Sequence, residues 1–177
     1  MPLTAAPDKS VELVETKEIE LFLPIMREID FGDAFLLSML HWCGIGERST
    51  PLECWRVFLL RLKSEIVGVS GLYRQPGTPA EICWLGWFAI RPQRQGFGTA
   101  AIHQLSYVAR NAGSTELWVY TGSNNNTART FYLSLGFEVL GPASDYAPGR
   151  TTDDSDIVLR RALVTADEIA VRSGPHS

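Results

Sequence analysis

The segment from residue 82 to residue 111 constrains the fold of this chain more than any other part of it. It opens with a nearly continuous apolar run, Ile82–Ile90, which is typical of a strand buried on both faces. A short polar turn that contains Gly96 and Gly98 follows. Residues 99–111 then carry apolar side chains at helical spacing. The sequence therefore predicts a buried strand, a tight turn and an amphipathic helix in direct succession.

The composition of the turn, Pro92–Ala100, indicates a site for an anion. The first N–H groups of a helix lack acceptors within the helix, and the helix dipole favours negative charge beside them. Glycines let the backbone approach a ligand closely and adopt positive φ, so two linked phosphates would suit such a turn. Judged by itself, the turn could equally be a plain strand-to-helix connection whose glycines serve geometry alone.

Two other nucleotide-binding motifs fit this sequence less well. The phosphate-loop pattern G-x-x-x-x-G-K-S/T does not occur in it. The dinucleotide pattern G-x-G-x-x-G is met only in its alanine variant, with Ala101 in the third position. Because no Rossmann-like series of strand–helix units follows the turn, neither of these folds is predicted.

The whole chain predicts a mixed α/β layer fold. Strands are expected at Val11–Val14, Cys54–Leu62, Ile66–Tyr73, Ile82–Ile90, Glu116–Tyr120, Phe137–Leu140 and Asp156–Arg160. Helices are expected from Lys17 onward and at Ala34–Trp42, Thr99–Asn111 and Thr127–Leu135, with a loop at Gly141–Ser155. Gly86, in the middle of a strand, predicts a bulge or a close backbone approach. Residues 1–10 are expected to be a flexible leader, residues 11–162 a single domain, and residues 163–177 a C-terminal tail.

Length and charge argue against several classes of protein. With 177 residues, of which 45% are hydrophobic and 20% charged, the chain can bury a core without disulfides or metals. A net charge of −4 and the lack of a Lys/Arg cluster argue against a nucleic-acid partner. No apolar stretch approaches the roughly 20 residues of a membrane span, and the N-terminus lacks the pattern of a signal peptide. We therefore expect a cytoplasmic protein with no membrane partner.

The cysteines and histidines show no metal-binding pattern. Cys43, Cys54 and Cys83 match no C-x-x-C spacing, and we expect them to be small buried hydrophobes. The three histidines likewise lack ligand spacing. The sequence therefore predicts no metal.

Two motifs occur in the order in which one enzyme family carries them. Gln95-Gly96-Phe97-Gly98-Thr99-Ala100 fits that family's cofactor motif, Gln/Arg-x-x-Gly-x-Gly/Ala at a helix start, and an overlapping register from Gln93 also fits. Downstream, its asparagine, alanine, aromatic pair and glycine-aromatic end are matched by Asn125, Ala128, Phe131-Tyr132 and Gly136-Phe137. Over about residues 52–140 the chain thus resembles the GNAT superfamily of acetyl-CoA-dependent N-acetyltransferases. The resemblance implies a central mixed, mostly antiparallel sheet flanked by helices on both faces.

The resemblance also implies roles for individual residues. The strand residues Phe88, Ala89 and Ile90 would pair through their backbone with the pantetheine arm of acetyl-CoA. The backbone N–H groups of Gln95, Gly96, Phe97, Gly98, Thr99 and Ala100 would hold the pyrophosphate, and Arg94 would add positive charge. Asn125 would hydrogen-bond the pantetheine or the loop beside it. Tyr132 would protonate the leaving thiolate, because a phenol can donate that proton; the alternative is a core tyrosine on an amphipathic helix.

The implied reaction is direct attack by a primary amine on the thioester, with a backbone N–H near Trp87 or Phe88 stabilising the oxyanion. The acceptor is expected to be a small-molecule amine. Acetylation of a protein N-terminus or lysine, and acyl-CoA binding without turnover, stay open as alternatives. Edge strands in this fold often pair between subunits, so the resemblance allows a homodimer.

The general base is left unassigned. Many relatives carry a glutamate where this chain has Tyr120. Glu81 and His103 are both interpreted as exposed side chains, although either carries suitable chemistry. The aromatic residues Trp84, Trp87, Trp118 and Tyr120 would lie close to the acceptor or in the core. The Asp145–Asp156 loop is carboxylate-rich, which suits either an ammonium-bearing acceptor or a solvated turn.

Overall fold

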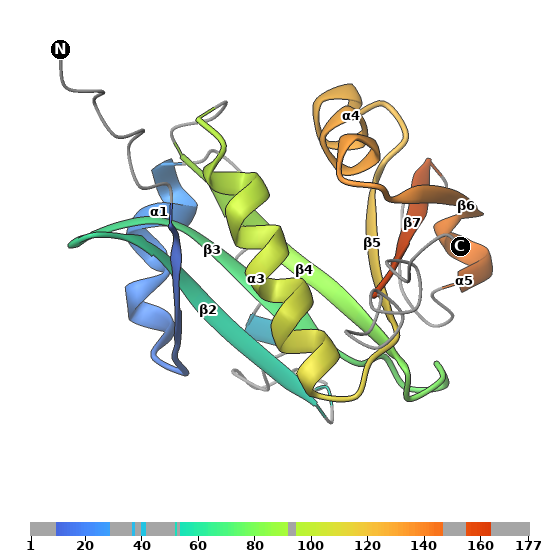
Figure 1. Cartoon of the computed structure of the whole chain (residues 1–177), viewed down its shortest axis with the longest axis horizontal. Helices are drawn as coiled ribbons and strands as arrows, with labels where there is room; N and C mark the ends of the chain where they lie inside the picture. Colours follow the sequence, from blue (N-terminus) through green and yellow to red (C-terminus); the bar gives the residue numbers. More distant parts are fainter. Residues whose placement is uncertain are drawn as a thin grey trace, which may run out of the picture. The chain divides into compact units, whose positions relative to one another are not determined.

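The structure is a computed structural model that describes residues 10–28, 37, 40–41, 52, 54–91, 95–146 and 155–163. Its strands are β1 (Glu12–Glu15), β2 (Trp55–Leu62), β3 (Glu65–Tyr73), β4 (Ile82–Ile90), β5 (Glu116–Gly122), β6 (Glu138–Pro142) and β7 (Asp156–Ala162). Its helices are the 3-10 helix η1 (Ile19–Leu21) and the α-helices α1 (Leu23–Glu28), α3 (Phe97–Asn111), α4 (Asn126–Ser134) and α5 (Ala143–Tyr146) (Figure 1).

The seven strands form one sheet in the order β1-β2-β3-β4-β5-β7-β6. Strands β4 and β5 pair in parallel, whereas β7 pairs antiparallel with both of its neighbours, and β1 pairs antiparallel with β2. The described part of the chain therefore has a mixed, mostly antiparallel sheet together with four α-helices. This confirms the predicted fold class.

The chain forms two compact units that interleave along the sequence. Unit 1 consists of residues 1–51, 56–71 and 87–105, and unit 2 of residues 52–55, 72–86 and 106–177. Strands β3 and β4 and helix α3 each contribute residues to both units. The expectation of a single domain over residues 11–162 stays a prediction.

The core of unit 1 joins the sheet to the start of helix α3. Its buried cluster consists of Val11, Leu60, Val67, Phe97 and Ala101. These residues come from the segment before β1, from β2 and β3, and from the first turns of α3. Burial of large apolar side chains is the main stabilising contribution to such a unit, at roughly 1.5–3 kcal/mol for each.

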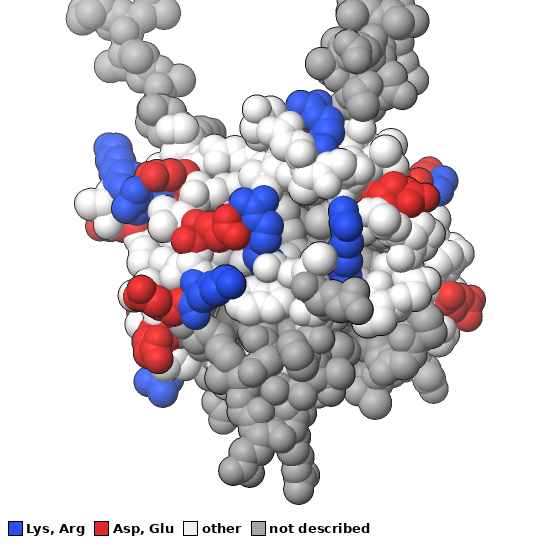
Figure 2. All heavy atoms as spheres, turned by 90° about the horizontal axis from the view of Figure 1, so that it is seen from below, with Lys and Arg blue, Asp and Glu red and all other residues white. Residues whose placement is uncertain are grey.

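Ion pairs cross the solvent-facing rows of strands β1 and β2. Arg56 pairs with Glu15 at 2.6 Å and Arg61 with Glu12 at 2.7 Å, and both pairs lie on exposed side chains. Over the face drawn in Figure 2, basic and acidic side chains of the described residues lie interspersed and do not gather into a patch of one sign. Exposed pairs of this kind contribute little stability individually.

The core of unit 2 is built on the paired strands β5 and β7. Leu117 and Val119 of β5, together with Val158 and Leu159 of β7, are all nearly inaccessible to solvent. Val119 stands directly opposite Leu159 in the ladder. Alternating apolar residues on neighbouring strands place their side chains side by side on the same face.

Most predicted elements are confirmed, and their ends differ by a few residues. Strand β4 has the predicted bounds, Ile82–Ile90. Helix α3 begins at Phe97, two residues before the predicted start, and β5 continues to Gly122. The helix expected from Lys17 is interrupted: the chain forms η1 first, and α1 begins at Leu23, so Pro24 lies in a first turn, where a proline is tolerated.

Three expectations about the chain are corrected or concern residues that lie largely outside the described ranges. The loop expected at Gly141–Ser155 contains a short helix, α5, whose Tyr146 packs back onto the sheet. The expected helix at Ala34–Trp42 is described only at residues 37, 40 and 41, which are helical. Of the expected leader (residues 1–10) and tail (residues 163–177), residues 1–9 and 164–177 lie outside the described residues.

The cysteines do not all behave as expected. Cys83 is buried within β4, as predicted, but Cys54 is exposed, because it lies in a bend before β2 begins and not on the strand's buried face. Cys43 lies outside the described residues.

Among the described residues, no group of three or more His, Cys, Asp or Glu side chains could hold a metal ion. No helix within the described ranges is long and apolar enough to cross a membrane.

Candidate cofactor and catalytic site

The predicted anion-binding turn has the backbone of a helix start. Gly96 has φ of +83°, a left-handed conformation that glycine adopts without the penalty of a Cβ atom. Its carbonyl oxygen accepts the N–H of Ala100 at 3.1 Å, the first bond of helix α3. The N–H groups of Phe97, Gly98 and Thr99 precede this bond, so they lie where a helix leaves its donors without intrahelical acceptors. Arg94 lies outside the described residues.

Packing on both sides holds this turn in place. Phe97, the first residue of α3, is buried in the core cluster of unit 1. Phe88 and Ile90 at the end of β4 pack against the same cluster, as does Ala100. Gln95 and Gly96 between them are exposed. The strand end and the helix start are therefore anchored in one core, while Gln95 and Gly96 face solvent.

Strand β4 departs from regular geometry at Trp87. This residue has φ of +51° although it is bulky and buried, with an exposed fraction of 5%. A non-glycine residue in this region costs on the order of 1–3 kcal/mol and persists only where its surroundings enforce it. This irregular residue directly follows Gly86, where the sequence predicted a bulge or a close backbone approach. Gly86 provides the close approach, since a Cβ atom there would lie 2.7 Å from Cε1 of Tyr73.

The backbone of β4 after Trp87 has two distinct edges. The N–H of Arg91 donates to the carbonyl of Val67 on β3 at 2.7 Å. The carbonyl oxygen of Ala89 also lies against β3, where a Cβ atom at Gly68 would be 2.4 Å from it. Since alternate residues of a strand direct their N–H and C=O groups to opposite edges, those of Phe88 and Ile90 point to the edge away from β3.

In unit 2, Asn125 begins helix α4. Its side-chain oxygen accepts the N–H of Ala128 at 3.1 Å, which is the usual bond of an asparagine N-cap. Its own N–H donates to Gly122 at 2.9 Å. Arg129, in the first turns of α4, donates from Nη1 to the carbonyl of Ser123 at 2.9 Å. The loop between β5 and α4 is therefore fixed from both ends.

Tyr132 lies on the buried side of α4, with an exposed fraction of 5%. Its ring packs between those of Phe131 and Phe137, with ring centroids 5.3 Å away in each case. Burial raises the pKa of the Tyr132 hydroxyl far above its ordinary value, because the phenolate would lose its hydration. The Tyr132 hydroxyl therefore keeps its proton at neutral pH.

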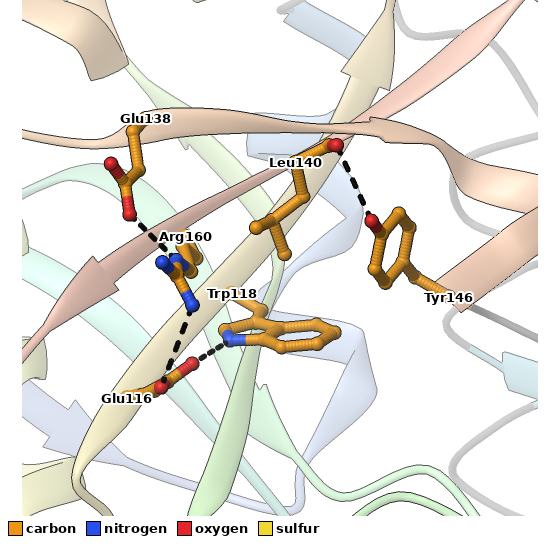
Figure 3. Close-up of polar contacts among 6 residues, drawn as sticks. All are labelled: Glu116, Trp118, Glu138, Leu140, Tyr146 and Arg160. Carbon is orange, nitrogen blue, oxygen red and sulfur yellow. Dashed lines mark hydrogen bonds and ion pairs between the residues drawn. The ribbon is translucent and has the colours of Figure 1, made fainter.

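A group of aromatic side chains lies together in unit 2. Trp118 of β5 contacts Tyr146 of α5 edge to face at 5.7 Å (Figure 3). Trp118 also contacts Trp84 of β4 at 5.4 Å. Tyr120 contacts Trp84 at 6.5 Å. Trp84 is fully buried, whereas Trp118 and Tyr120 are partly exposed. The aromatic residues expected near the acceptor therefore include both core and partly accessible members.

Polar contacts hold the partly exposed members of this group in position. The indole N–H of Trp118 donates to Glu116 at 2.5 Å, and the Tyr146 hydroxyl donates to the carbonyl of Leu140 at 3.3 Å (Figure 3). Arg160 stands opposite Trp118 in the ladder and donates to Glu138 at 2.6 Å. The hydrogen bond to Glu138 and its negative charge raise the pKa of Arg160, so this guanidinium stays charged.

The two candidate bases have the surroundings that the sequence predicted. Glu81 is exposed just before β4, and its carbonyl accepts the N–H groups of Thr115 and Glu116. His103 is exposed on α3. Of the Asp145–Asp156 loop, residues 147–154 lie outside the described residues.

The predicted site residues fall into two groups. Unit 1 brings the β4 residues Phe88–Ile90 together with the turn Gln95–Ala100 around one core. Unit 2 carries Asn125 and Tyr132 on one helix. Sequence reasoning missed the glycines of β3 that contact β4, because the sequence of a single strand does not show which residues of a neighbouring strand lie opposite it. It also missed Arg129, whose partner Ser123 is six residues away.

Unit 1 therefore carries a left-handed glycine at a helix start and a left-handed residue in β4, and unit 2 carries a buried tyrosine on a capped helix. The sequence matches the model of the acetyltransferase (GNAT) family over residues 20–137, which is more than half of the chain. The chain belongs to the GNAT family, as its motifs predicted. Comparison with curated proteins gave no match.

Solved structures with the same fold are acetyltransferases at low sequence identity. The Bacillus subtilis acetyltransferase in complex with CoA is 17% identical, with a TM-score of 0.60, over 88% of this chain and 99% of that one. A GNAT family acetyltransferase from Elizabethkingia anophelis with acetyl-CoA bound is 18% identical, with a TM-score of 0.61, over 86% and 98%. The ribosomal-protein-S18-alanine N-acetyltransferase from Escherichia coli is 20% identical, with a TM-score of 0.61, over 89% and 95%. At these identities the likeness concerns the fold.

Proposed function

We propose that this GNAT protein is an N-acetyltransferase that moves the acetyl group of acetyl-CoA to a primary amine, and that the amine belongs to a small molecule. The observation that carries the proposal is the turn at Gly96, whose exposed backbone joins a bulged strand to a helix start anchored by Phe97. Two GNAT-fold structures with CoA or acetyl-CoA bound support acetyl-CoA as the co-substrate.

Each part of the turn and strand has a proposed role in cofactor binding. The N–H groups of Gln95–Ala100 bind the pyrophosphate, with the helix dipole of α3 contributing to the attraction. Arg94 adds a positive charge. The backbone of Phe88–Ile90 pairs with the pantetheine arm along the edge away from β3. Asn125 hydrogen-bonds the pantetheine or the loop beside it.

The proposed chemistry is a single transfer between two bound substrates. The amine nitrogen attacks the thioester carbonyl carbon, a C–N bond forms, and the C–S bond breaks. A backbone N–H near Trp87 or Phe88 stabilises the oxyanion. Tyr132 donates its proton to the departing thiolate, which leaves as CoA thiol. The attacking nitrogen releases one proton to solvent, and Tyr132 regains a proton from solvent before the next turnover. Holding both reactants in place contributes much of the acceleration.

The partly exposed aromatic side chains support an amine acceptor with an apolar or cationic part. Trp118 and Tyr120 present ring surface, and a tryptophan face attracts an ammonium group by cation–π interaction. The second candidate acceptor is a protein N-terminus. It is favoured by the shared fold with the ribosomal-protein-S18-alanine N-acetyltransferase.

The proposal is tested by calorimetric titration with acetyl-CoA, followed by a free-thiol release assay over a panel of amines. Binding together with thiol release by one class of small amine would establish the reaction and name the acceptor. Release with a peptide N-terminus alone would favour the protein acceptor. Failure to bind acetyl-CoA would overturn the assignment of the turn and everything built on it.

A further inference from the structure

We propose that Gly71 on β3 forms a seat for the ring of Trp87 and thereby holds this residue of β4 in its left-handed conformation, which makes Trp87 a positioning residue for the cofactor arm. The proposal deepens the proposed function and rests on it, because the arm in question is the pantetheine of acetyl-CoA. Both residues belong to unit 1, as do the strand residues Phe88–Ile90 that they position.

The conformation of Trp87 requires an explanation from its surroundings. Among the described non-glycine residues only Lys63 and Trp87 have positive φ. Lys63 lies in the tight turn between β2 and β3, where positive φ is common. Trp87 lies within a strand, and for a bulky side chain φ of +51° is a genuine outlier. Packing must therefore hold this residue in place.

Gly71 on β3 provides that packing. A Cβ atom at Gly71 would lie 2.4 Å from Cε3 and 2.7 Å from Cζ3 of Trp87. The six-membered ring of the indole thus occupies the space that any other side chain at position 71 would fill. Because the ring is nearly inaccessible to solvent, it has little room to move away from a new methyl group. The ring of Trp87 can occupy its observed position only because residue 71 is a glycine.

The conformation of Trp87 decides which backbone groups of β4 face which edge. A left-handed residue within a strand turns the backbone, as in a bulge, and changes the facing of the residues that follow it. With Trp87 left-handed, Ala89 and Arg91 face β3, and Phe88 and Ile90 face the opposite edge. If Trp87 became extended, this order would shift by one residue. The pantetheine arm would then meet the groups of Ala89 in place of those of its neighbours.

The test is a double-mutant cycle on acetyl-CoA affinity, measured by calorimetry. We expect Gly71→Ala and Trp87→Ala each to weaken binding at least tenfold. The double variant should bind no more weakly than Trp87→Ala alone. Without the ring, the next neighbour of the new methyl group is the carbonyl oxygen of Arg56 at 3.5 Å, an ordinary contact. As a control, Gly77→Ala strains a loop at φ of +80° with open space around it, and it should leave the affinity unchanged.

A second pair of variants tests the strain without reference to the cofactor. An ordinary strand position favours alanine over glycine, whereas a position with positive φ favours glycine. Trp87→Gly should therefore have a higher Tm than Trp87→Ala. A higher Tm for Trp87→Ala than for Trp87→Gly would show that residue 87 is not strained and would overturn the proposal.

The outcomes separate this proposal from the proposed function. Wild-type protein that binds acetyl-CoA, together with a Gly71→Ala variant that binds it equally well, would overturn the seat and leave the function intact. Wild-type protein that fails to bind would overturn the function. In that case the unfolding free energies of wild type, the two single variants and the double variant test the seat. Strictly additive effects of the two substitutions would show that Gly71 and Trp87 are not coupled and would overturn it.

Discussion

Replacing Tyr132 by phenylalanine separates the proposed proton donor from a residue that only packs. The change removes one oxygen atom and keeps the ring between Phe131 and Phe137. With only 5% of the residue exposed, the ring's packing accounts for most of its contribution to stability, so Tm should change little. We expect the stability of the variant to lie within about 1 kcal/mol of wild type.

The catalytic effect should be much larger than the effect on stability. A positioned general acid accelerates a reaction by roughly 10²- to 10⁴-fold, which corresponds to about 3–5 kcal/mol of transition-state stabilisation. We therefore expect kcat to fall by at least a factor of about 100. The KM for acetyl-CoA should stay within about twofold, because the hydroxyl acts on the departing thiolate and not on the bound thioester. Thiol release under saturating amine measures both parameters.

The raised pKa of Tyr132 adds a pH signature. In the folded state the phenol keeps its proton above pH 10, the ordinary value at which the unfolded chain loses it. The folded protein therefore binds more protons than the unfolded chain above that pH, and stability declines as pH rises, by at most about 1.4 kcal/mol per pH unit. The Tyr132→Phe variant should lack this part of the decline. Thermal melts between pH 9 and 11 compare the two.

The matched control is Tyr107→Phe, which makes the same chemical change at an exposed position on α3. It should leave kcat, KM and the alkaline stability profile unchanged. The reasoning is refuted if Tyr132→Phe keeps wild-type kcat, because Tyr132 would then be a core tyrosine. A raised KM with unchanged kcat would instead assign the hydroxyl to ground-state binding.

Three further predictions concern stability and cofactor affinity. Hydrogen bonding to Arg56 lowers the pKa of Glu15 below 4.5. The stabilising effect of the Glu15 carboxylate is therefore present above pH 4.5 and is lost as pH falls through the pKa of Glu15 in the folded protein. In acid melts, the Tm of Glu15→Gln should fall less steeply with pH than that of wild type. Gly96→Ala should destabilise the protein by about 1–2 kcal/mol, because alanine is strained at φ of +83°. Calorimetry should also show weaker acetyl-CoA binding. An unchanged affinity would show that the turn does not bind the cofactor. Asn125→Ala should cost about 0.5–2 kcal/mol in urea unfolding through loss of the cap, with Asn125→Ser closer to wild type.

Local signals in the sequence predicted the elements that position the site. The unbroken apolar run at Ile82–Ile90 predicted a buried strand at its observed bounds. The glycines after it predicted the helix start, because Gly96 adopts a conformation that other residues avoid. The spacing of Ala128, Phe131, Tyr132 and Leu135 predicted an amphipathic helix, which is α4, and the structure adds Asn125 as its cap. Each of these signals acts within a few residues, so no distant partner was needed to interpret it.

The remaining features depend on which distant residues meet. Trp87 reads in the sequence as one more apolar strand residue, and its left-handed conformation follows from Gly71, sixteen positions earlier, lying beneath its ring. Cys54 reads as a buried hydrophobe but is exposed, because β2 begins one residue later than its composition suggested. By itself the sequence determined the strand, the turn, the helix and the family. Only the tertiary structure decided where β4 departs from regular geometry and which backbone groups of β4 face away from β3. Strand register and side-chain contacts form between distant segments, and neither segment alone predicts them.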